Sequence, residues 1–182
     1  MLNDAVLDTL FRHARSHNRW SDRPVDDALL KQVFELMKWG PTSANTSPAR
    51  IVFVKSAAAK ERLLACMDTG NVDKTRSAPV IAIVGMDMEF YEKLPQLFPH
   101  TDARSWFAGN PAKIEETAFR NSSLQGGYLI MAARALGLDC GPMSGFDPQR
   151  VNQEFFAGTP VRANFVCGLG YGNGEHLHAR SP

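Results

Sequence analysis

The chain has 182 residues, a length typical of one domain with a buried core. Its composition, 44% hydrophobic and 21% charged residues, is that of a folded globular protein and excludes a disordered chain. The net charge of +1 excludes a broad basic surface for nucleic acid or an anionic membrane, so any anion site has to be local.

The cysteines and the N-terminus predict the compartment. The chain has three cysteines, Cys66, Cys140 and Cys167, and no pair of them has C-x-x-C spacing. An odd number without that spacing argues against a disulfide framework and for a reducing environment. The N-terminus has no basic segment followed by an apolar run, and no stretch approaches the roughly 20 apolar residues that span a bilayer. We therefore expect a cytoplasmic protein with neither a membrane nor a nucleic-acid partner.

The first half of the chain predicts two helices, a loop and two strands. Apolar residues recur at helical spacing over 5–13, and again from the N-cap Asp26 to Gly40. A loop rich in Pro, Thr, Ser and Asn follows at 41–48. The pattern then predicts a strand at 51–54, a helix at 57–67 and a buried strand at 79–86.

The second half predicts a lid, a long helix and a few short elements. Residues 94–111 carry three prolines and no clear period, which predicts an irregular lid. The longest helical pattern runs over 112–136, with a strand from 138 to 140, a helix from Pro148 and a last strand at 165–167. Because helices and strands are mixed without regular βαβ alternation, we predict an α+β fold.

Gly126 and Gly127 lie in the middle of the long helix, where each costs about 1 kcal/mol relative to Ala. Close packing against another backbone would offset that cost. A contact with a second subunit is our expectation, and packing within one chain is the alternative.

A glycine-rich run at 168–174 follows the last strand and superficially resembles a dinucleotide-binding loop. That motif needs a helix N-terminus to meet the pyrophosphate, and only eight residues follow the run. We expect a flexible exit from the strand instead, and a Rossmann-type dehydrogenase is the disfavoured alternative.

Other chemical motifs are weak. His176 and His178 alternate along the chain without a third ligand at metal-binding spacing, so we predict no metal site. Neither Ser43 nor Ser144 lies in a G-x-S-x-G motif, and Cys140 has the character of a small core residue rather than a nucleophile.

Three polar loops remain, at 15–20, 41–48 and 141–146, together with Arg180 near the end. Each alone is compatible with a solvated helix end, a helix-to-strand connection or a turn. Their combination is what indicates a function.

The loops and their order resemble the nitroreductase superfamily of flavin enzymes, over nearly the whole chain from about residue 7 to 182. The matching segments are RSHNRW at 15–20, PTSANTSP at 41–48, ALGL at 135–138, PMSGFD at 142–147 and HAR at 178–180. The segments at 37–45, 94–100, 102–107 and 141–147 look like the malonic semialdehyde reductase branch in particular.

The resemblance implies a single nitroreductase-like domain over 1–182, with a central mixed or antiparallel sheet flanked by helices, which forms a homodimer. It implies FMN as cofactor and NADH or NADPH as hydride donor. The expected reaction carries hydride through flavin N5 to a small carbonyl substrate, malonic semialdehyde reduced to 3-hydroxypropanoate in pyrimidine degradation. A broad-specificity nitroreductase or quinone reductase and a non-enzymatic flavin-binding protein are the alternatives.

The resemblance also implies site residues. Arg15, Ser16, Asn18 and Arg180 would hold the FMN phosphate, Asn45 the flavin ring or ribityl chain, and the Ser144 amide the flavin N5. Arg104 in the lid is our candidate for a substrate carboxylate. The complete set of cofactor contacts is Arg15, Ser16, Asn18, Pro41, Thr42, Ser43, Asn45, Pro142, Met143, Ser144, Gly145, His178 and Arg180.

The chain departs from the family pattern at a few places. Asn18 stands where many members have a second basic residue, Ser47 where they have Gln, and His178 where they have Lys. Each change weakens a bond to the flavin that the pattern would supply. The chain also ends soon after Arg180, so we expect a C-terminal tail that is short or truncated relative to the family.

Overall fold

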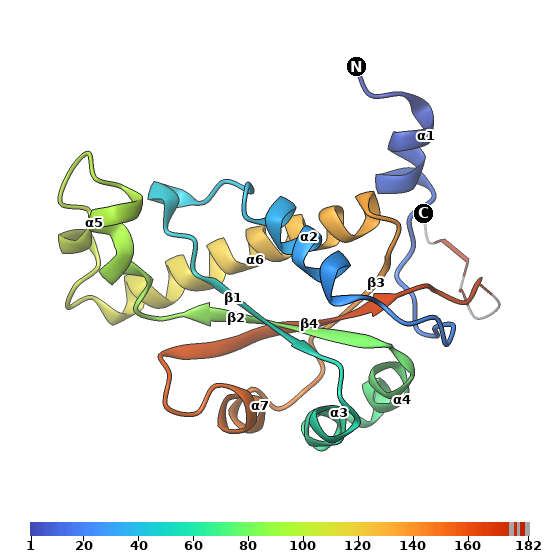
Figure 1. Ribbon diagram of the computed structural model, residues 1–182. Helices are drawn as coiled ribbons and strands as arrows, with labels where there is room; N and C mark the ends of the chain where they lie inside the picture. The colour runs from blue at the N-terminus through green and yellow to red at the C-terminus, as the bar shows by residue number, and fades with distance from the viewer. Residues whose placement is uncertain (175–176, 178, 181–182) are drawn as a thin grey trace.

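The computed structural model describes residues 1–174, 177 and 179–180. A four-stranded antiparallel sheet in the order β1-β2-β4-β3 lies at its centre (Figure 1). The strands are β1 (Ala49–Val54), β2 (Val80–Asp87), β3 (Asp139–Met143) and β4 (Val161–Gly170). The predicted α+β fold is therefore confirmed, with a sheet that is antiparallel rather than mixed.

Helices cover both faces of the sheet (Figure 1). One face carries α2 (Asp27–Met37) and the long α6 (Pro111–Ala135), which pack on each other and enclose the larger core with Leu30, Val33 and Leu129. The other carries α3 (Ala57–Leu64), α4 (Thr69–Ser77) and α7 (Pro148–Phe155). Because apolar groups lie on both sides of it, β2 is buried along its whole length.

Helix starts follow local capping chemistry. The Ser56 side chain accepts from the Ala59 amide at the start of α3, and Asp147 accepts from the Gln149 and Arg150 amides at the start of α7. A short helical segment precedes the sheet, α1 (Asp4–Leu7) continued by the π-turn η1 (Asp8–Arg12). It confirms the helix predicted over 5–13.

Two predictions between residues 57 and 111 were wrong. The helix expected to reach 67 ends at Leu64, and the unpredicted α4 follows it. The lid expected to be irregular at 94–111 contains two short helices, α5 (Leu94–Leu97) and η4 (Arg104–Trp106), and a third, η3 (Phe90–Lys93), lies immediately before it. These helices have a small core of their own, in which the rings of Phe90 and Phe107 pack edge to face with centroids 5.0 Å apart.

The two glycines of α6 have different surroundings. A Cβ on Gly126 would lie 2.4 Å from the Phe165 ring of the same chain, so the missing side chain makes room within the subunit. The expectation of a subunit contact is therefore wrong for Gly126. No atom lies within 4 Å of a Cβ placed on Gly127.

Candidate functional site

A cavity of about 460 Å³ lies beside the C-terminal end of α6. It brings together Arg15, Ser16, Asn18 and Arg180, four residues that the sequence analysis grouped around one phosphate. Among the described lining residues none is acidic, while three carry guanidinium groups: Arg15, Arg180 and Arg134. The lining is suited to an anion with more than one charge.

Arg134 is the member of this cavity that the sequence analysis missed. It lies in the last turn of α6, where a basic residue is usually explained by the helix dipole. Its Nη1 donates to the carbonyl oxygen of Leu10 at 3.0 Å, which holds η1 against the helix. This bond fixes a third cation in the wall of the cavity.

The 15–20 segment is attached to the sheet edge next to β3. Ser16 forms a parallel β-bridge with Cys140, and the His17 amide donates to the Cys140 carbonyl at 2.9 Å. Farther along, Trp20 pairs with Gly172, and the Asn173 amide donates to the Arg19 carbonyl at 2.9 Å. The arginine and serine of this segment are thus held on a rigid support.

The glycine-rich run makes room for Trp20 and His17. A Cβ on Gly168 would lie 2.7 Å from Cζ2 of Trp20, and one on Gly172 would lie 1.9 Å from Nδ1 of His17. Gly168 and Gly170 belong to β4, so the expected flexible exit from the strand was wrong. Close packing under a buried indole explains these glycines, and the described residues after β4 contain no α-helix of the kind that a dinucleotide loop requires.

The loop after β3 approaches α4 closely. Pro142 and Met143 belong to the strand itself, which corrects the predicted start of the loop. The Gly145 carbonyl accepts from Asn71 Nδ2 at 3.0 Å and from the Asp68 amide at 3.1 Å. A Cβ on Gly145 would lie 2.4 Å from Asn71 Nδ2. A side chain at position 145 would have to displace the side chains of Asn71 and Asp68.

Asn71 and Lys74 are polar groups beside this loop that the sequence analysis did not identify. The Lys74 ammonium donates to Asn71 Oδ1 at 3.3 Å. Both residues lie on α4, whose sequence TGNVDKTRS has too few apolar residues to predict a helix. They were missed because their helix was missed.

The 41–48 loop lies along the middle of α6 and beside α5. It contains the short 3₁₀ helix η2 (Ser43–Asn45). The Ser43 amide donates to Asn121 Oδ1 at 2.8 Å, and Asn45 Nδ2 donates to the Leu97 carbonyl at 2.9 Å. Thr42 Oγ1 accepts from the Ser47 amide at 3.1 Å, and Pro41 is exposed at the start of the loop.

Within one chain the cavity lined by Arg15, Arg134 and Arg180 is far from the 41–48 loop. Asn121, which contacts the loop, and Arg134, which lines the cavity, are 13 positions apart on α6. At 1.5 Å per residue they are separated by about 20 Å along the helix axis. Figure 1 shows the same separation, with α5 at one end of the molecule and the N-terminal segment at the other.

Arg104 and His178 complete the predicted set. Arg104 forms a two-pronged ion pair with Glu92, with Nε and Nη2 each 2.7 Å from a carboxylate oxygen. This bond lowers the pKa of Glu92 and raises that of Arg104. His178 and His176 lie outside the described residues, and the described part of the chain contains no cluster of metal-ligating side chains.

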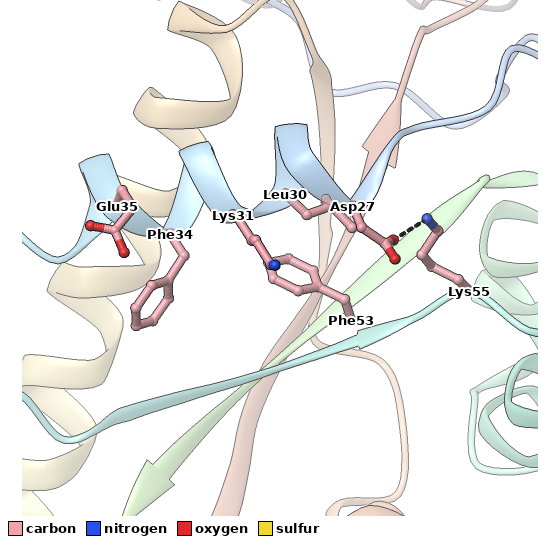
Figure 2. Close-up of a pocket in the computed structure, with 7 residues that line it drawn as sticks. All are labelled: Asp27, Leu30, Lys31, Phe34, Glu35, Phe53 and Lys55. Atoms are coloured by element: carbon pink, nitrogen blue, oxygen red, sulfur yellow. Dashed lines mark hydrogen bonds and ion pairs between the residues drawn. The ribbon is translucent and has the colours of Figure 1, made fainter.

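Another hollow, of about 790 Å³, lies elsewhere on the surface. Figure 2 shows it between α2 and β1, where the rings of Phe34 and Phe53 lie among charged side chains and Lys55 pairs with Asp27. None of the predicted site residues lines it.

In the part of the chain that the structure describes, no helix is long and apolar enough to cross a membrane.

The fold agrees with the comparisons to known proteins. The model of the nitroreductase family matches residues 11–173, and the chain belongs to this family. A Burkholderia lata protein named for a proposed NADH dehydrogenase/NAD(P)H nitroreductase activity is 65% identical over 181 residues, which cover 100% of this chain and 93% of that protein. A Polynucleobacter asymbioticus protein named for the same proposed activity is 60% identical over 182 residues, with the same coverage.

Solved structures share the fold at low sequence identity. A proposed nitroreductase from Bacillus subtilis superposes with a TM-score of 0.85 at 20% identity, covering 99% of this chain and 95% of that one. A proposed nitroreductase from Exiguobacterium sibiricum, solved in complex with FMN, gives 0.83 at 16% identity, covering 100% and 95%.

Proposed function

We propose that this protein is an FMN-dependent oxidoreductase that takes hydride from NADH or NADPH. The observation that carries the proposal is the cavity in which Arg15, Arg134 and Arg180 lie with Ser16 and Asn18. An FMN phosphate carries close to two negative charges and several acceptor oxygens, and these side chains supply cations and neutral donors without a competing carboxylate among those described. The names of the relatives and the FMN complex of a structural neighbour support the same cofactor chemistry.

The remaining flavin contacts would come from two loops. Asn45 would bind the ring edge or ribityl hydroxyls after releasing the Leu97 carbonyl, to which it now donates. The backbone at Met143–Gly145 would lie against the flavin, with the Ser144 amide directed at N5. FMN, when bound, supplies the hydride transfer, and the protein supplies position and electrostatics. His178 would add a donor near the phosphate.

A homodimer is part of this proposal. Because the cavity and the 41–48 loop are separated by about 20 Å along α6 within one chain, we infer that a flavin that contacts both uses the cavity of one copy and the loop of another. Large apolar side chains remain exposed on α6 and beside it: Trp39 is 78% exposed, Phe119 54%, Leu124 50% and Tyr128 44%. A second copy would cover such a surface.

The substrate we propose is a small carbonyl compound, malonic semialdehyde reduced to 3-hydroxypropanoate in pyrimidine degradation. Its support is the resemblance of the 94–107 and 141–147 segments to that branch of the family. Arg104 would bind the carboxylate of this substrate, and for this it has to leave Glu92. The three cysteines are free and buried, which fits the cytoplasm as the compartment.

The second candidate is a broad-specificity NAD(P)H nitroreductase or quinone reductase, which the names of the relatives favour. Steady-state kinetics with malonic semialdehyde, a nitroaromatic and a quinone separate the two. We expect parallel double-reciprocal lines for donor and acceptor, since both use one flavin, and the highest kcat/KM for malonic semialdehyde. A higher kcat/KM for nitroaromatics and quinones would assign the broad activity instead.

A further inference from the structure

The 41–48 loop has an unusual backbone. Ala44, Asn45 and Ser47 have φ angles of 47°, 51° and 39°, in the left-handed region that residues with a Cβ rarely adopt. None of the three is glycine, so each costs free energy that the surroundings have to offset. The loop keeps this shape only if its backbone is fixed from outside.

Two buried amide side chains of α6 provide that fixation. Asn121 is 1% exposed, and its Oδ1 accepts from the Ser43 amide at 2.8 Å. Its Nδ2 donates to the Thr117 carbonyl at 2.8 Å, which determines which way the amide points. One turn farther, Gln125 is 4% exposed and its Oε1 accepts from the Ala49 amide at 2.8 Å. The loop is therefore held on one helix at both ends.

A buried polar stripe on a helix is costly unless each group has a partner. Here the buried oxygens of Asn121 and Gln125 accept from the backbone amides of Ser43 and Ala49. These hydrogen bonds form only while the backbone from the loop to the start of β1 keeps its present conformation. Asn121 acts on Ser43, only two positions before Asn45 and within the same 3₁₀ turn. The orientation of the Asn45 side chain is thus coupled to a residue that lies outside the loop.

We propose that Asn121 is a positioning residue for the flavin: it holds the 41–48 loop in its left-handed shape and so orients Asn45, with Gln125 as the second tie. The inference rests on the proposed flavin function. Arg50 gives an independent tie, because its Nη1 donates to the Ser47 carbonyl at 3.0 Å while Nη2 pairs with the buried Asp87 at 2.6 Å. Loss of Asn121 alone therefore loosens the loop without releasing it.

The test compares Asn121→Ala with Asn164→Ala. Asn164 Nδ2 donates to the hydroxyls of Ser122 and Ser123, at 2.8 and 3.0 Å, on the same helix but away from the loop. Each variant loses hydrogen bonds between α6 and another segment, and both are expected to lower the Tm. Only Asn121→Ala is expected to weaken flavin binding, by about tenfold, which is the size of one lost hydrogen bond.

Riboflavin, which has no phosphate, identifies where the loss acts. In fluorescence titrations of the full chain, Asn121→Ala should raise the Kd of FMN and of riboflavin by the same factor, whereas Arg15→Ala should raise that of FMN alone. Asn121→Asp keeps an acceptor for the Ser43 amide and should recover most of the flavin affinity despite a lower Tm.

Several results would overturn the inference. Wild-type affinity in Asn121→Ala does so, as does an equal loss in Asn164→Ala, which would mean that stability alone sets the Kd. If Asn121→Ala does not fold, Gln125→Ala replaces it, with a smaller parallel rise in both Kd values expected and wild-type values contradicting it. A wild-type protein that binds neither flavin defeats the proposed function, and this inference with it.

Discussion

Arg180 donates from Nη2 to the carbonyl oxygen of Ala14 at 2.7 Å, although the two residues are 166 positions apart. This bond brings the last described arginine beside Arg15 and closes the cavity that Arg134 lines from α6. The proposed anion site is thus assembled from three separate segments. Its charge is concentrated at one place on a chain whose net charge is only +1.

Loss of a guanidinium group from this cavity should weaken binding of the phosphate specifically. Arg15→Ala and Arg134→Ala should each raise the Kd of FMN by roughly 10–100-fold, the size of a charge-assisted hydrogen bond, and leave the Kd of riboflavin nearly unchanged. Arg19→Ala is the matched control, since Arg19 belongs to the same segment but does not line the cavity. Equal losses for both flavins would show that these arginines do not hold the phosphate.

A methyl group on Gly168 should displace Trp20. Since the added Cβ would lie 2.7 Å from the buried indole, Gly168→Ala should lower the free energy of unfolding by about 1–3 kcal/mol, the usual cost of overpacking. FMN affinity should fall too, because Trp20 anchors the segment that carries Arg15. Gly174→Ala, with no atom of the described residues within 4 Å of the added Cβ, should leave both unchanged. Urea denaturation and FMN titration give the two readings.

Replacing Ala44 with glycine should stabilise the folded protein. Its φ of 47° strains a residue with a Cβ, so Ala44→Gly should raise the free energy of unfolding by about 0.5–1 kcal/mol, despite the greater freedom of glycine in the unfolded chain. Ala58→Gly, at an exposed position inside α3, should instead lower it by about 1 kcal/mol. A loss of stability in Ala44→Gly would contradict a strained loop.

Substitutions of Glu92 and Arg104 should change the KM for a carboxylated substrate in opposite directions. If Arg104 binds the substrate carboxylate, Arg104→Ala raises the KM for malonic semialdehyde and not for a quinone. Glu92→Gln, which frees the guanidinium from its ion pair, lowers that KM. Equal changes for the two substrates would leave Arg104 with the role it has in the structure, a link between η3 and η4.

Stability should fall in alkaline solution under reducing conditions. A hydrogen bond with the Cys140 thiol, together with burial, raises the pKa of Cys167 well above its usual value. Above the pKa of an unfolded cysteine, about 8.5, the unfolded chain releases this proton while the folded protein keeps it. The free energy of unfolding therefore decreases as the pH rises through that range. Cys167→Ala should flatten this dependence, and an unchanged slope would exclude Cys167 as its source.

The sequence predicted those parts of the fold that have a clear local signal. Asp26 is the N-cap of α2 as predicted, although the helix ends at Met37, before the predicted stop at Gly40. The apolar run of β2 marked a central strand. By contrast, α4 is polar almost throughout and is stabilised by packing against α3, which no local pattern reveals.

The candidate site was predicted in the same uneven way. The motif residues Arg15, Ser16, Asn18 and Arg180 do converge on one cavity. Arg134 was missed because a helix C-terminus gives arginine an ordinary explanation. Nor does the order of motifs along a chain give distances, so the separation of the cavity from the 41–48 loop, and the support of that loop by Asn121, required the structure.

Anaerobic reduction of the bound flavin tests the central claim most directly. The purified protein, saturated with FMN, is titrated with NADH and with NADPH while the visible absorbance of the flavin is followed. The proposed function predicts that at least one donor bleaches the flavin at one equivalent per site, and that a carbonyl, nitro or quinone acceptor restores the colour. Flavin that stays oxidised with both donors, or a protein that binds no FMN, would contradict it.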